Sequence, residues 1–366
     1  MFIDLPQILE LRKAWKNSFF ENNIFINNYL QLIKNIEIGG TFIPENLAYE
    51  GLTDIEIIAA LQYLVVDLNI KHLRIGLRLD KIDLNKGDIG LYKKILKYCF
   101  DNNIKLILNL GPIKYCGWPE YHLSETIKNN TNTLPKIKSI INSNSEISLV
   151  SRAELEKLLI LLTTLYSASE LKNVITLQAE NESFNAFGKY KWVFSEDHLT
   201  EIIHLFDIYF PRRSILVNSA GLFDTNSIIN FIKKRSDSKR FTLGLNYYYD
   251  FDKFRNLKFY RWLDLYVFSW KLKNFNLSFI KKMQTKYCFK TEITEAQMEP
   301  WGRANDPGNS IQSLKFVILR SAIFLKQNNG YIGLYGLDRL AMKAIRKNLN
   351  HEHLEMIDLI KKIQNK

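Results

Sequence analysis

The sequence has few cysteines, and they form no recognisable pattern. Cys99, Cys116 and Cys288 are odd in number and widely spaced. This spacing fits neither a disulfide framework nor a cysteine metal site, so a reducing compartment is expected. His351 and His353 are two residues apart in a predicted helix and do not share a face, so no metal site is predicted there either.

The sequence also has no long apolar run. Asp4 and Glu10 interrupt the apolar core that an N-terminal signal peptide would need. The longest apolar runs, residues 159–166 and 316–325, are too short or too charged to cross a bilayer. We therefore expect a cytoplasmic protein with no membrane partner.

A dense basic block is missing as well, although the chain is basic. Lys and Arg number 50 against 38 Asp and Glu, which gives a net charge of +12. The lysines are scattered through helix-like stretches such as residues 93–106, without interleaved aromatic clusters. We therefore do not expect nucleic acid as a partner. An acidic glycan would also suit a basic chain, but the sequence does not place the charges near a cleft.

Gly/Ser-rich and Pro-rich linkers are missing too, and the chain alternates instead. Short β-branched or apolar runs are followed by longer amphipathic stretches, which is typical of parallel βα units. No G-x-G-x-x-G follows the first strand and residues 36–40 are not a phosphate loop, so a doubly wound sheet is disfavoured and no cofactor is predicted. The eight predicted strands are residues 37–43, 71–77, 104–110, 174–179, 214–218, 241–248, 287–294 and 331–335.

The predicted fold class is therefore α/β, a (β/α)₈ TIM barrel with an N-terminal helical extension. Residues 1–36 are expected to form the extension, packed on the barrel, and residues 37–366 the barrel domain. Thr53 is a plausible N-cap for the helix after the first strand. A long insertion at residues 112–150 separates the third strand from its helix.

Glutamates gather near the ends of the fourth and seventh predicted strands, the edge where barrel enzymes place reactive residues. Taken one at a time, a strand-end glutamate is usually a solvated rim residue. Carboxyl groups at two facing strand ends are, however, what glycoside hydrolysis requires. These residues are Glu180 and Glu182 after the fourth strand, and Glu292, Glu295 and Glu299 near the end of the seventh.

The chain resembles the clan A glycoside hydrolases, retaining (β/α)₈ enzymes with catalytic glutamates after strands four and seven. The pair Asn181-Glu182 is similar to the clan's Asn-Glu acid/base motif, and Arg74 matches its second-strand arginine. Four longer segments resemble a bacterial cellulase-like, family 5-like subgroup, in the same order: 39-GGTFIPENLAYEGL, 73-LRIGLRLDKID, 109-NLGPIKYCGWPEYH and 294-TEAQMEPWG.

The resemblance implies double displacement on an oligosaccharide or glycoside, with Glu182 as acid/base and Glu295 as nucleophile. Glu292 lies deeper in its strand and Glu299 precedes Pro300, so Glu295 is preferred to both. We expect burial and the charge of Glu295 to keep Glu182 protonated near neutral pH. The two carboxyl groups are expected about 5–5.5 Å apart, the retaining separation.

The resemblance also implies several substrate contacts. Asn181 is expected at the sugar 2-hydroxyl, and Arg74 with a tyrosine is expected to keep Glu295 ionised. Asn246 and Tyr248 share one strand face, so Tyr248 rather than Tyr247 is predicted to point inward, although both are ordinary strand formers. The remaining candidate sugar contacts are Trp118, His122, Glu299, Trp301 and Tyr335.

The sequence departs from the pattern in three places. Ser183 stands where the clan often has Pro, Asp338 where the subgroup has Glu, and Arg78-Leu79 where an aromatic pair is expected. These departures leave the catalytic pair intact and concern the sugar subsites. A barrel that binds carbohydrate without cleaving it, and a transglycosylase, stay open as alternatives. The sugar, the linkage and the oligomeric state have no readable code in the sequence.

Overall fold

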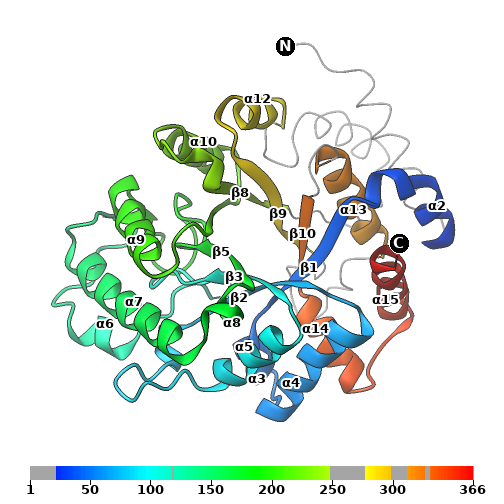
Figure 1. The fold of residues 1–366 in the computed structure, drawn as a ribbon, viewed down its shortest axis with the longest axis horizontal. Helices are drawn as coiled ribbons and strands as arrows, with labels where there is room; N and C mark the ends of the chain where they lie inside the picture. The colour runs from blue at the N-terminus through cyan, green and yellow to red at the C-terminus, as the bar shows by residue number, and fades with distance from the viewer. Residues whose placement is uncertain (1–21, 118, 248–276, 298–310, 326–329, 366) are drawn as a thin grey trace.

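The computed structural model of the protein describes residues 22–117, 119–247, 277–297, 311–325 and 330–365 (Figure 1). Eight parallel strands close into a barrel in the order β1-β10-β9-β8-β7-β5-β3-β2, which confirms the predicted (β/α)₈ fold class. The barrel strands are β1 Ile36–Phe42, β2 His72–Gly76, β3 Lys105–Asn109, β5 Val174–Gln178, β7 Ser214–Ser219, β8 Phe241–Tyr247, β9 Lys290–Gln297 and β10 Gly330–Tyr335.

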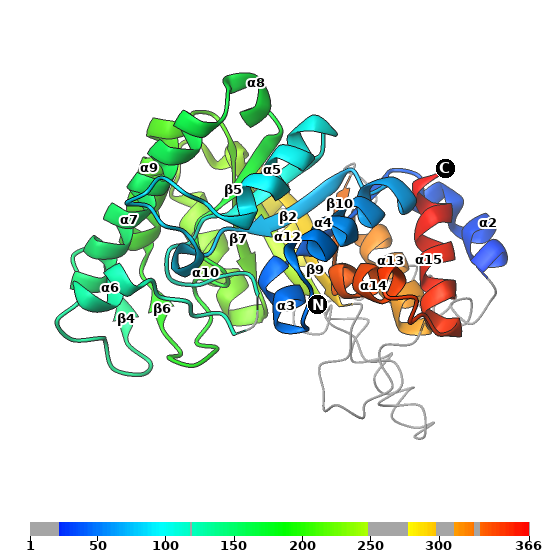
Figure 2. The ribbon, with the colours of Figure 1, turned by 90° about the horizontal axis from the view of Figure 1, so that it is seen from below.

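Helices surround the barrel and bury their apolar faces against it (Figures 1 and 2). The predicted N-cap is confirmed, because Thr53 accepts a hydrogen bond from the Glu56 amide at 3.3 Å in a capping box. The described helices are α2 Asn22–Ile33, α3 Pro44–Tyr49, α4 Asp54–Gln62, η1 Tyr63–Asp67, η2 Leu79–Lys81, α5 Leu91–Asp101, α6 Glu125–Asn129, α7 Glu146–Leu165, α8 Ala168–Leu171, α9 Glu196–Tyr209, α10 Leu222–Lys233, η3 Ser238–Arg240, α12 Leu277–Tyr287, α13 Ile311–Leu325, α14 Leu337–Ile345 and α15 His351–Gln364.

The first described helix, α2, lies beside α13 and α15 outside the barrel (Figure 1). Phe25, Tyr29 and Ile33 recur every four residues and are buried, so one face of α2 packs into the hydrophobic core. No described helix has the length and apolar character needed to cross a membrane.

The insertion after β3 forms a small layer of its own. The two-residue strands β4 Ile140–Ile141 and β6 Val193–Phe194 pair in parallel outside the barrel. Tyr190 and Trp192 stack with ring centroids 4.3 Å apart, and Tyr121 meets Trp192 edge to face. These aromatic contacts fasten the loop after β3 to the loop after β5, both of which border the C-terminal end of the barrel.

The seventh barrel strand differs from its predicted range. Helix α12 runs to Tyr287, so β9 begins at Lys290 and continues to Gln297, beyond the predicted end at residue 294. Glu295 therefore lies inside the strand and not after it. The predicted range is wrong because the partly apolar residues 287–289 resemble the beginning of a strand, whereas Tyr287 ends α12 and the next two residues connect it to β9.

A β-bulge in β9 then decides which side chains face the interior. Ile293 pairs with Leu245 of β8, but the next pair is Glu295 with Asn246, so Thr294 is an extra residue. The pairing with β10 shifts at the same point. Thr294 donates a hydrogen bond to the inward-facing Asn246 at 2.9 Å, and Glu295 contacts Arg74 inside the barrel. Two consecutive side chains thus point inward, which a regular strand does not allow.

Gly111, directly after β3, gives a test of how tightly the strand ends are packed. A Cβ at this position would lie 2.3 Å from the carbonyl oxygen of Ala179 and 2.7 Å from Cα of Glu180. We expect Gly111→Ala to lower the free energy of unfolding by roughly 1–3 kcal/mol, the usual cost of overpacking. Urea denaturation of both proteins would measure it, and an unchanged midpoint would contradict this packing.

Candidate active site

Polar side chains from five strands meet inside the C-terminal end of the barrel. Each is almost completely buried, with 3% exposure or less. Buried polar groups must be hydrogen-bonded or paired to offset their desolvation, so this cluster has to be organised as one network. The five are Arg74 on β2, Gln178 on β5, Asn218 on β7, Asn246 on β8 and Glu295 on β9.

Arg74 joins three of the elements. Its Nε donates to Gln178 Oε1 at 2.8 Å, and its Nη2 donates to Asn181 Oδ1 at 2.8 Å. Its Nη1 donates to the Glu295 carboxylate in a short ion pair. The planar guanidinium thus holds β5 and β9 in fixed orientation and places a full positive charge against Glu295.

Asn218, at the end of β7, organises the opposite side of the network. Its Nδ2 donates to Asn181 Oδ1 at 2.8 Å, and its Oδ1 accepts from the Glu182 backbone amide at 2.8 Å. Gln178 Nε2 also donates to Asn218 Oδ1 at 2.8 Å. Neither Asn218 nor Gln178 was predicted, and a strand end carrying an amide side chain was the only signal available for them.

Glu182 lies at this network in an unusual backbone conformation. Its φ is +44°, in the left-handed region that side-chain-bearing residues seldom occupy. Asn246 Nδ2 donates to Glu182 Oε1 at 2.7 Å, and Asn185 Nδ2 donates to Oε2 at 2.8 Å. Burial, together with the negative charge of Glu295, raises the pKa of Glu182 to about 7. Glu182 and Glu295 are therefore close enough to influence each other, yet have different immediate partners.

A buried lysine supports the backbone of this segment. Lys114, in the loop after β3, is fully buried, and its ammonium donates to the carbonyl oxygens of Glu182 at 3.2 Å and Asn185 at 2.8 Å. Glu120 approaches the same ammonium, with Nζ and Oε2 3.6 Å apart. Burial raises the pKa of Glu120 to about 8, which Lys114 opposes. Sequence reasoning missed Lys114, since a lysine in a polar insertion is ordinarily solvated.

Glu180 is not a rim residue, because its side chain is fully buried. Its Oε2 accepts from the Lys114 backbone amide at 2.6 Å, and His198 Nε2 lies 3.4 Å from Oε1. Burial raises the pKa of Glu180, while His198 lowers it. Glu180 thus ties the loop after β3 to the end of β5 and helps to position the segment that bears Glu182.

Some of the remaining candidate residues are described by the structure, and the others lie outside the described residues. Tyr247 is buried and its hydroxyl accepts from Arg320 of α13 at 3.2 Å, so this side chain faces the helix layer. Tyr335 is half-buried and packs against Ile43, Tyr115 and Cys116 beside the network. Four predicted contacts lie outside the described residues: Trp118, Tyr248, Glu299 and Trp301.

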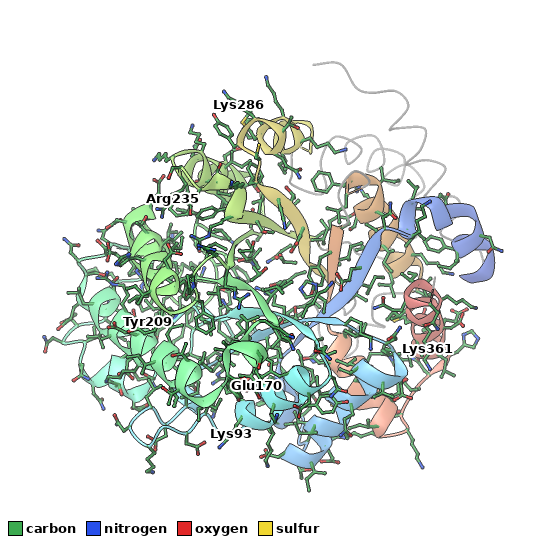
Figure 3. The ribbon with its side chains drawn as sticks, viewed as in Figure 1. Lys93, Glu170, Tyr209, Arg235, Lys286 and Lys361 are labelled. Atoms are coloured by element: carbon green, nitrogen blue, oxygen red, sulfur yellow. The ribbon has the colours of Figure 1, made fainter. Side chains whose placement is uncertain are left out.

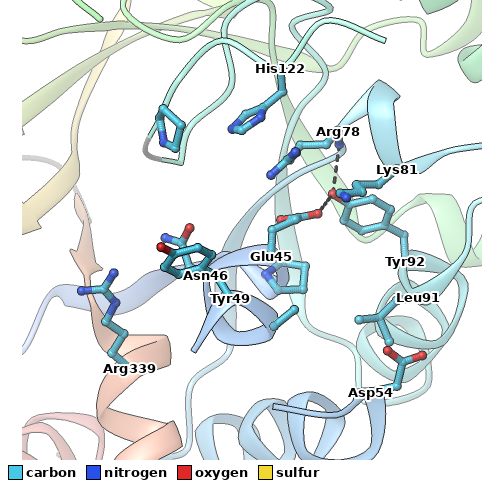
Figure 4. A pocket seen from close by; sticks show the side chains of 13 residues that line it. Glu45, Asn46, Tyr49, Asp54, Arg78, Lys81, Leu91, Tyr92, His122 and Arg339 are labelled. Carbon is cyan, nitrogen blue, oxygen red and sulfur yellow. Dashed lines mark hydrogen bonds between the residues drawn. The ribbon is translucent and has the colours of Figure 1, made fainter. Parts of the chain in front are cut away.

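His122 lies farther from the network, in a pocket beside it (Figure 4). Its ring meets Tyr115 edge to face at 5.9 Å. Burial, with the positive charge of Arg78, lowers the pKa of His122 to about 4, so the ring is neutral at physiological pH.

Asp338 serves the fold and does not point into the network. Its Oδ2 accepts from the Ile43 amide at 3.1 Å, directly after β1, and its Oδ1 accepts from the Arg339 amide at 2.9 Å. Burial raises its pKa to about 6. This departure from the glutamate of the resembling subgroup therefore has a structural explanation: the shorter acid closes the junction between β1 and α14.

The arrangement can carry out proton transfer and nucleophilic attack with two carboxyl groups. The pKa of Glu182 is about 7, and the carboxylate of Glu295 is paired with the fixed positive charge of Arg74. Within the described ranges, no group of three or more His, Cys, Asp or Glu side chains is arranged to hold a metal ion.

The fold is similar to those of known xylanase structures. The intracellular xylanase of Thermoanaerobacterium saccharolyticum JW/SL-YS485, complexed with xylotriose, matches with TM-score 0.50 and 11% identity over 82% of this chain and 85% of that chain. The CBM22 and GH10 modules of endo-1,4-beta-D-xylanase 10B from Clostridium thermocellum, complexed with xylohexaose, match with TM-score 0.50 and 9% identity over 83% and 59%. No protein-family model and no curated protein sequence matches the chain. Identities this low establish the shared barrel fold alone.

Lys114→Met tests whether the buried ammonium supports the site. The substitution removes the donor to two buried carbonyl groups. We expect the free energy of unfolding to fall by about 2 kcal/mol or more, because a buried acceptor without a donor costs about 1–3 kcal/mol.

Lys128→Met, in the same insertion, is the matched control, because Lys128 is half-exposed and its one ion pair among the described residues is with exposed Glu125. This variant should change stability by less than about 1 kcal/mol. Equal losses for the two variants in urea denaturation would contradict a supporting role for Lys114.

Proposed function

We propose that the protein is a retaining glycoside hydrolase, with Glu182 as acid/base and Glu295 as nucleophile. The observation that best supports this assignment is the unequal environment of the two buried carboxyl groups. The pKa of Glu182 is raised to about 7 by burial and by Glu295, whereas Glu295 is ion-paired with Arg74. A retaining enzyme needs one protonated and one ionised carboxyl at the same bond.

In the first step Glu182 protonates the glycosidic oxygen while Glu295 attacks the anomeric carbon. The bond to the leaving group breaks, and a glycosyl ester forms on Glu295. In the second step the ionised Glu182 removes a proton from water, which attacks the anomeric carbon and releases Glu295. Both steps use only carboxyl groups of the chain, so the proposal includes no metal or cofactor.

Asn181 suits the proposed contact with the sugar 2-hydroxyl. Its Oδ1 accepts hydrogen bonds from Arg74 and Asn218, both at 2.8 Å. Its oxygen is thus occupied, and Nδ2 has no hydrogen-bond partner among the described residues, so it can donate to a ligand. A hydrogen bond at the 2-hydroxyl strengthens as the transition state develops.

An oligosaccharide is the proposed substrate class. The two similar xylanase structures hold xylotriose and xylohexaose, which supports a carbohydrate ligand for this barrel. Transfer of the glycosyl group to a second sugar uses the same intermediate and differs only in the acceptor. A barrel that binds sugar without cleaving it is the competing function, and loss of activity in single-residue variants separates the two.

The assignment predicts the behaviour of Glu182→Ala and Glu295→Ala on aryl β-glycosides. Each variant should lose at least about a hundredfold in kcat/KM, the smallest typical contribution of a general acid or base. Azide should restore turnover by Glu295→Ala and yield a glycosyl azide of inverted configuration, because the small anion replaces the missing nucleophile.

Glu125→Ala is the control. It also removes a glutamate, but the Glu125 side chain is exposed on α6. Its activity should equal that of the wild type. Sugar binding without hydrolysis by the wild type would favour the non-catalytic barrel. Inversion of configuration by the wild type would contradict the proposed nucleophile, because the retaining mechanism places the carboxyl groups about 5–5.5 Å apart, without room for a water between them.

The pH dependence of activity gives a separate prediction. Glu182 must be protonated to act in the first step, so kcat/KM should fall as pH rises through about 7. The hydrogen bond from Asn185 lowers the pKa of Glu182 because it stabilises the carboxylate. Asn185→Ala should therefore move this fall to higher pH. A pH profile that is unchanged in Asn185→Ala would contradict the assignment of this limb to Glu182.

A further inference from the structure

The pocket that His122 lines opens at the C-terminal end of the barrel, as do the proposed catalytic carboxyl groups (Figure 4 shows the pocket). It has a volume of about 900 Å³ and lies among α3, η2, α5, the loop after β3 and the beginning of α14. This volume is within the range of ligand-binding pockets, roughly 300–1,000 Å³. The almost fully exposed ring of Tyr49 stands at its edge and offers an apolar face to a sugar.

Tyr115 and Cys116 link the pocket to the surroundings of Glu295. Tyr115 donates a hydrogen bond to Glu45 on the pocket wall at 2.9 Å, and its neighbour Cys116 packs toward the catalytic side. The charges of Arg74 and Glu295 both act on the Cys116 thiol, whose pKa burial raises to about 12. The pocket therefore lies close enough to Glu295 for one oligosaccharide along this end of the barrel to reach both.

The carboxylates of the pocket are already occupied by groups of the protein. Glu45 accepts hydrogen bonds from the hydroxyls of both Tyr92 and Tyr115. Asp54, at the outer edge, lies 3.7 Å from the ammonium of Lys94. These acids are therefore partly or fully satisfied before any ligand binds.

Two cations of the pocket, Arg78 and Lys81, keep donors for a ligand. Arg78 uses Nε and Nη2 to hold Asp80, at 2.9 and 2.5 Å, so within the described part of the chain its Nη1 has no hydrogen-bond partner. Lys81 is exposed and forms no ion pair with any described residue. Arg339, from α14, approaches the pocket from the opposite side (Figure 4).

The pocket thus has cationic side chains on two sides of one cavity, with donors available on Arg78 and Lys81, while its carboxylates already have partners. A neutral sugar offers hydroxyl groups that both donate and accept, so it does not need a pocket in which donors are available and acceptors are not. A carboxylate offers acceptors alone, and Arg and Lys bind it through charge-assisted hydrogen bonds. The net charge of the whole chain is +12, but its lysines are spread over the outer helices. Examples are Lys93 on α5, Lys286 on α12 and Lys361 on α15, which point outward (Figure 3). Arg78, Lys81 and Arg339 are the basic residues that face this pocket.

We propose that this pocket binds a carboxylate-bearing sugar unit, so that the substrate is an acidic glycan containing uronic acid. The inference rests on the proposed glycoside hydrolase function, since it assigns the sugar next to the cleaved bond or a unit beyond it. Arg78 and Lys81 on one side and Arg339 on the other receive the carboxylate, and the neutral ring of His122 adds a polar contact without charge.

The test is calorimetric binding to matched pairs of tetrasaccharides, one neutral and one with a single uronate in place of a neutral unit. Xylo-, gluco- and manno-configured pairs are used, in the Glu182→Gln background to prevent turnover. In at least one pair the uronate member should bind about tenfold tighter, as expected for one charge-assisted hydrogen bond. The preference should decrease as salt is added.

Lys81→Gln and Arg339→Gln should each reduce that preference by at least about threefold, because each removes one charge from the pocket. Lys172→Gln is the matched control, since it removes one exposed lysine just before β5, at the N-terminal end of the barrel, and should leave the preference unchanged. Circular dichroism of each variant verifies that the fold is retained.

Equal binding within every pair, or no binding of any uronate member, would overturn the proposal. A preference that survives in the Lys81→Gln, Arg339→Gln double variant would also overturn it, because the carboxylate would then bind elsewhere. Failure of the hydrolase assignment is distinguishable: the wild type would then prefer the uronate members without cleaving any aryl glycoside or oligosaccharide.

Discussion

The buried charge of Arg74 is the constraint on which the rest of the site depends. A guanidinium with no exposed surface is tolerated only when every part of it is paired. Gln178, Asn181 and Glu295 meet this requirement from two different strands. The charge therefore orders the end of β5 and the bulge of β9 together, and it is ion-paired with Glu295. Glu182 is a second buried acid next to that pair. Its pKa is raised because its ionisation would place a second negative charge beside Glu295.

Two local irregularities of the backbone position Glu182 and Glu295 near Arg74. The bulge in β9 turns Glu295 inward directly after Thr294, and Glu182, in the left-handed backbone region, accepts a hydrogen bond from Asn246 of β8. Strained or irregular backbone persists only where neighbouring contacts hold it. Lys114 and Asn218 supply those contacts from opposite sides, by a carbonyl and an amide of Glu182. The site thus depends on residues that never need to touch a substrate.

The sequence predicted the parts of this structure that follow from periodicity. All eight barrel strands overlap their predicted ranges, because buried parallel strands are short apolar runs between amphipathic helices. The β9 boundary and the bulge could not be read, because one extra residue leaves no trace in an apolar pattern. Asn218 and Lys114 were missed for a related reason: their importance comes from burial against residues distant in sequence. The proposed roles of Trp118, Tyr248, Glu299 and Trp301 stay predictions.

The departures from the resembling subgroup acquire different meanings once their surroundings are known. Asp338 accepts the Ile43 amide, so its shorter side chain belongs to the junction of β1 with α14 and is no evidence of a lost sugar contact. Arg78 instead faces a cavity, where an aromatic residue would offer only a stacking surface. A flat aromatic face can stack on any sugar, whereas a guanidinium in its place favours a ligand that carries negative charge. The catalytic network and the adjoining pocket can therefore diverge separately, since Tyr115 and Cys116 separate the groups that would break the bond from the groups that would select the sugar.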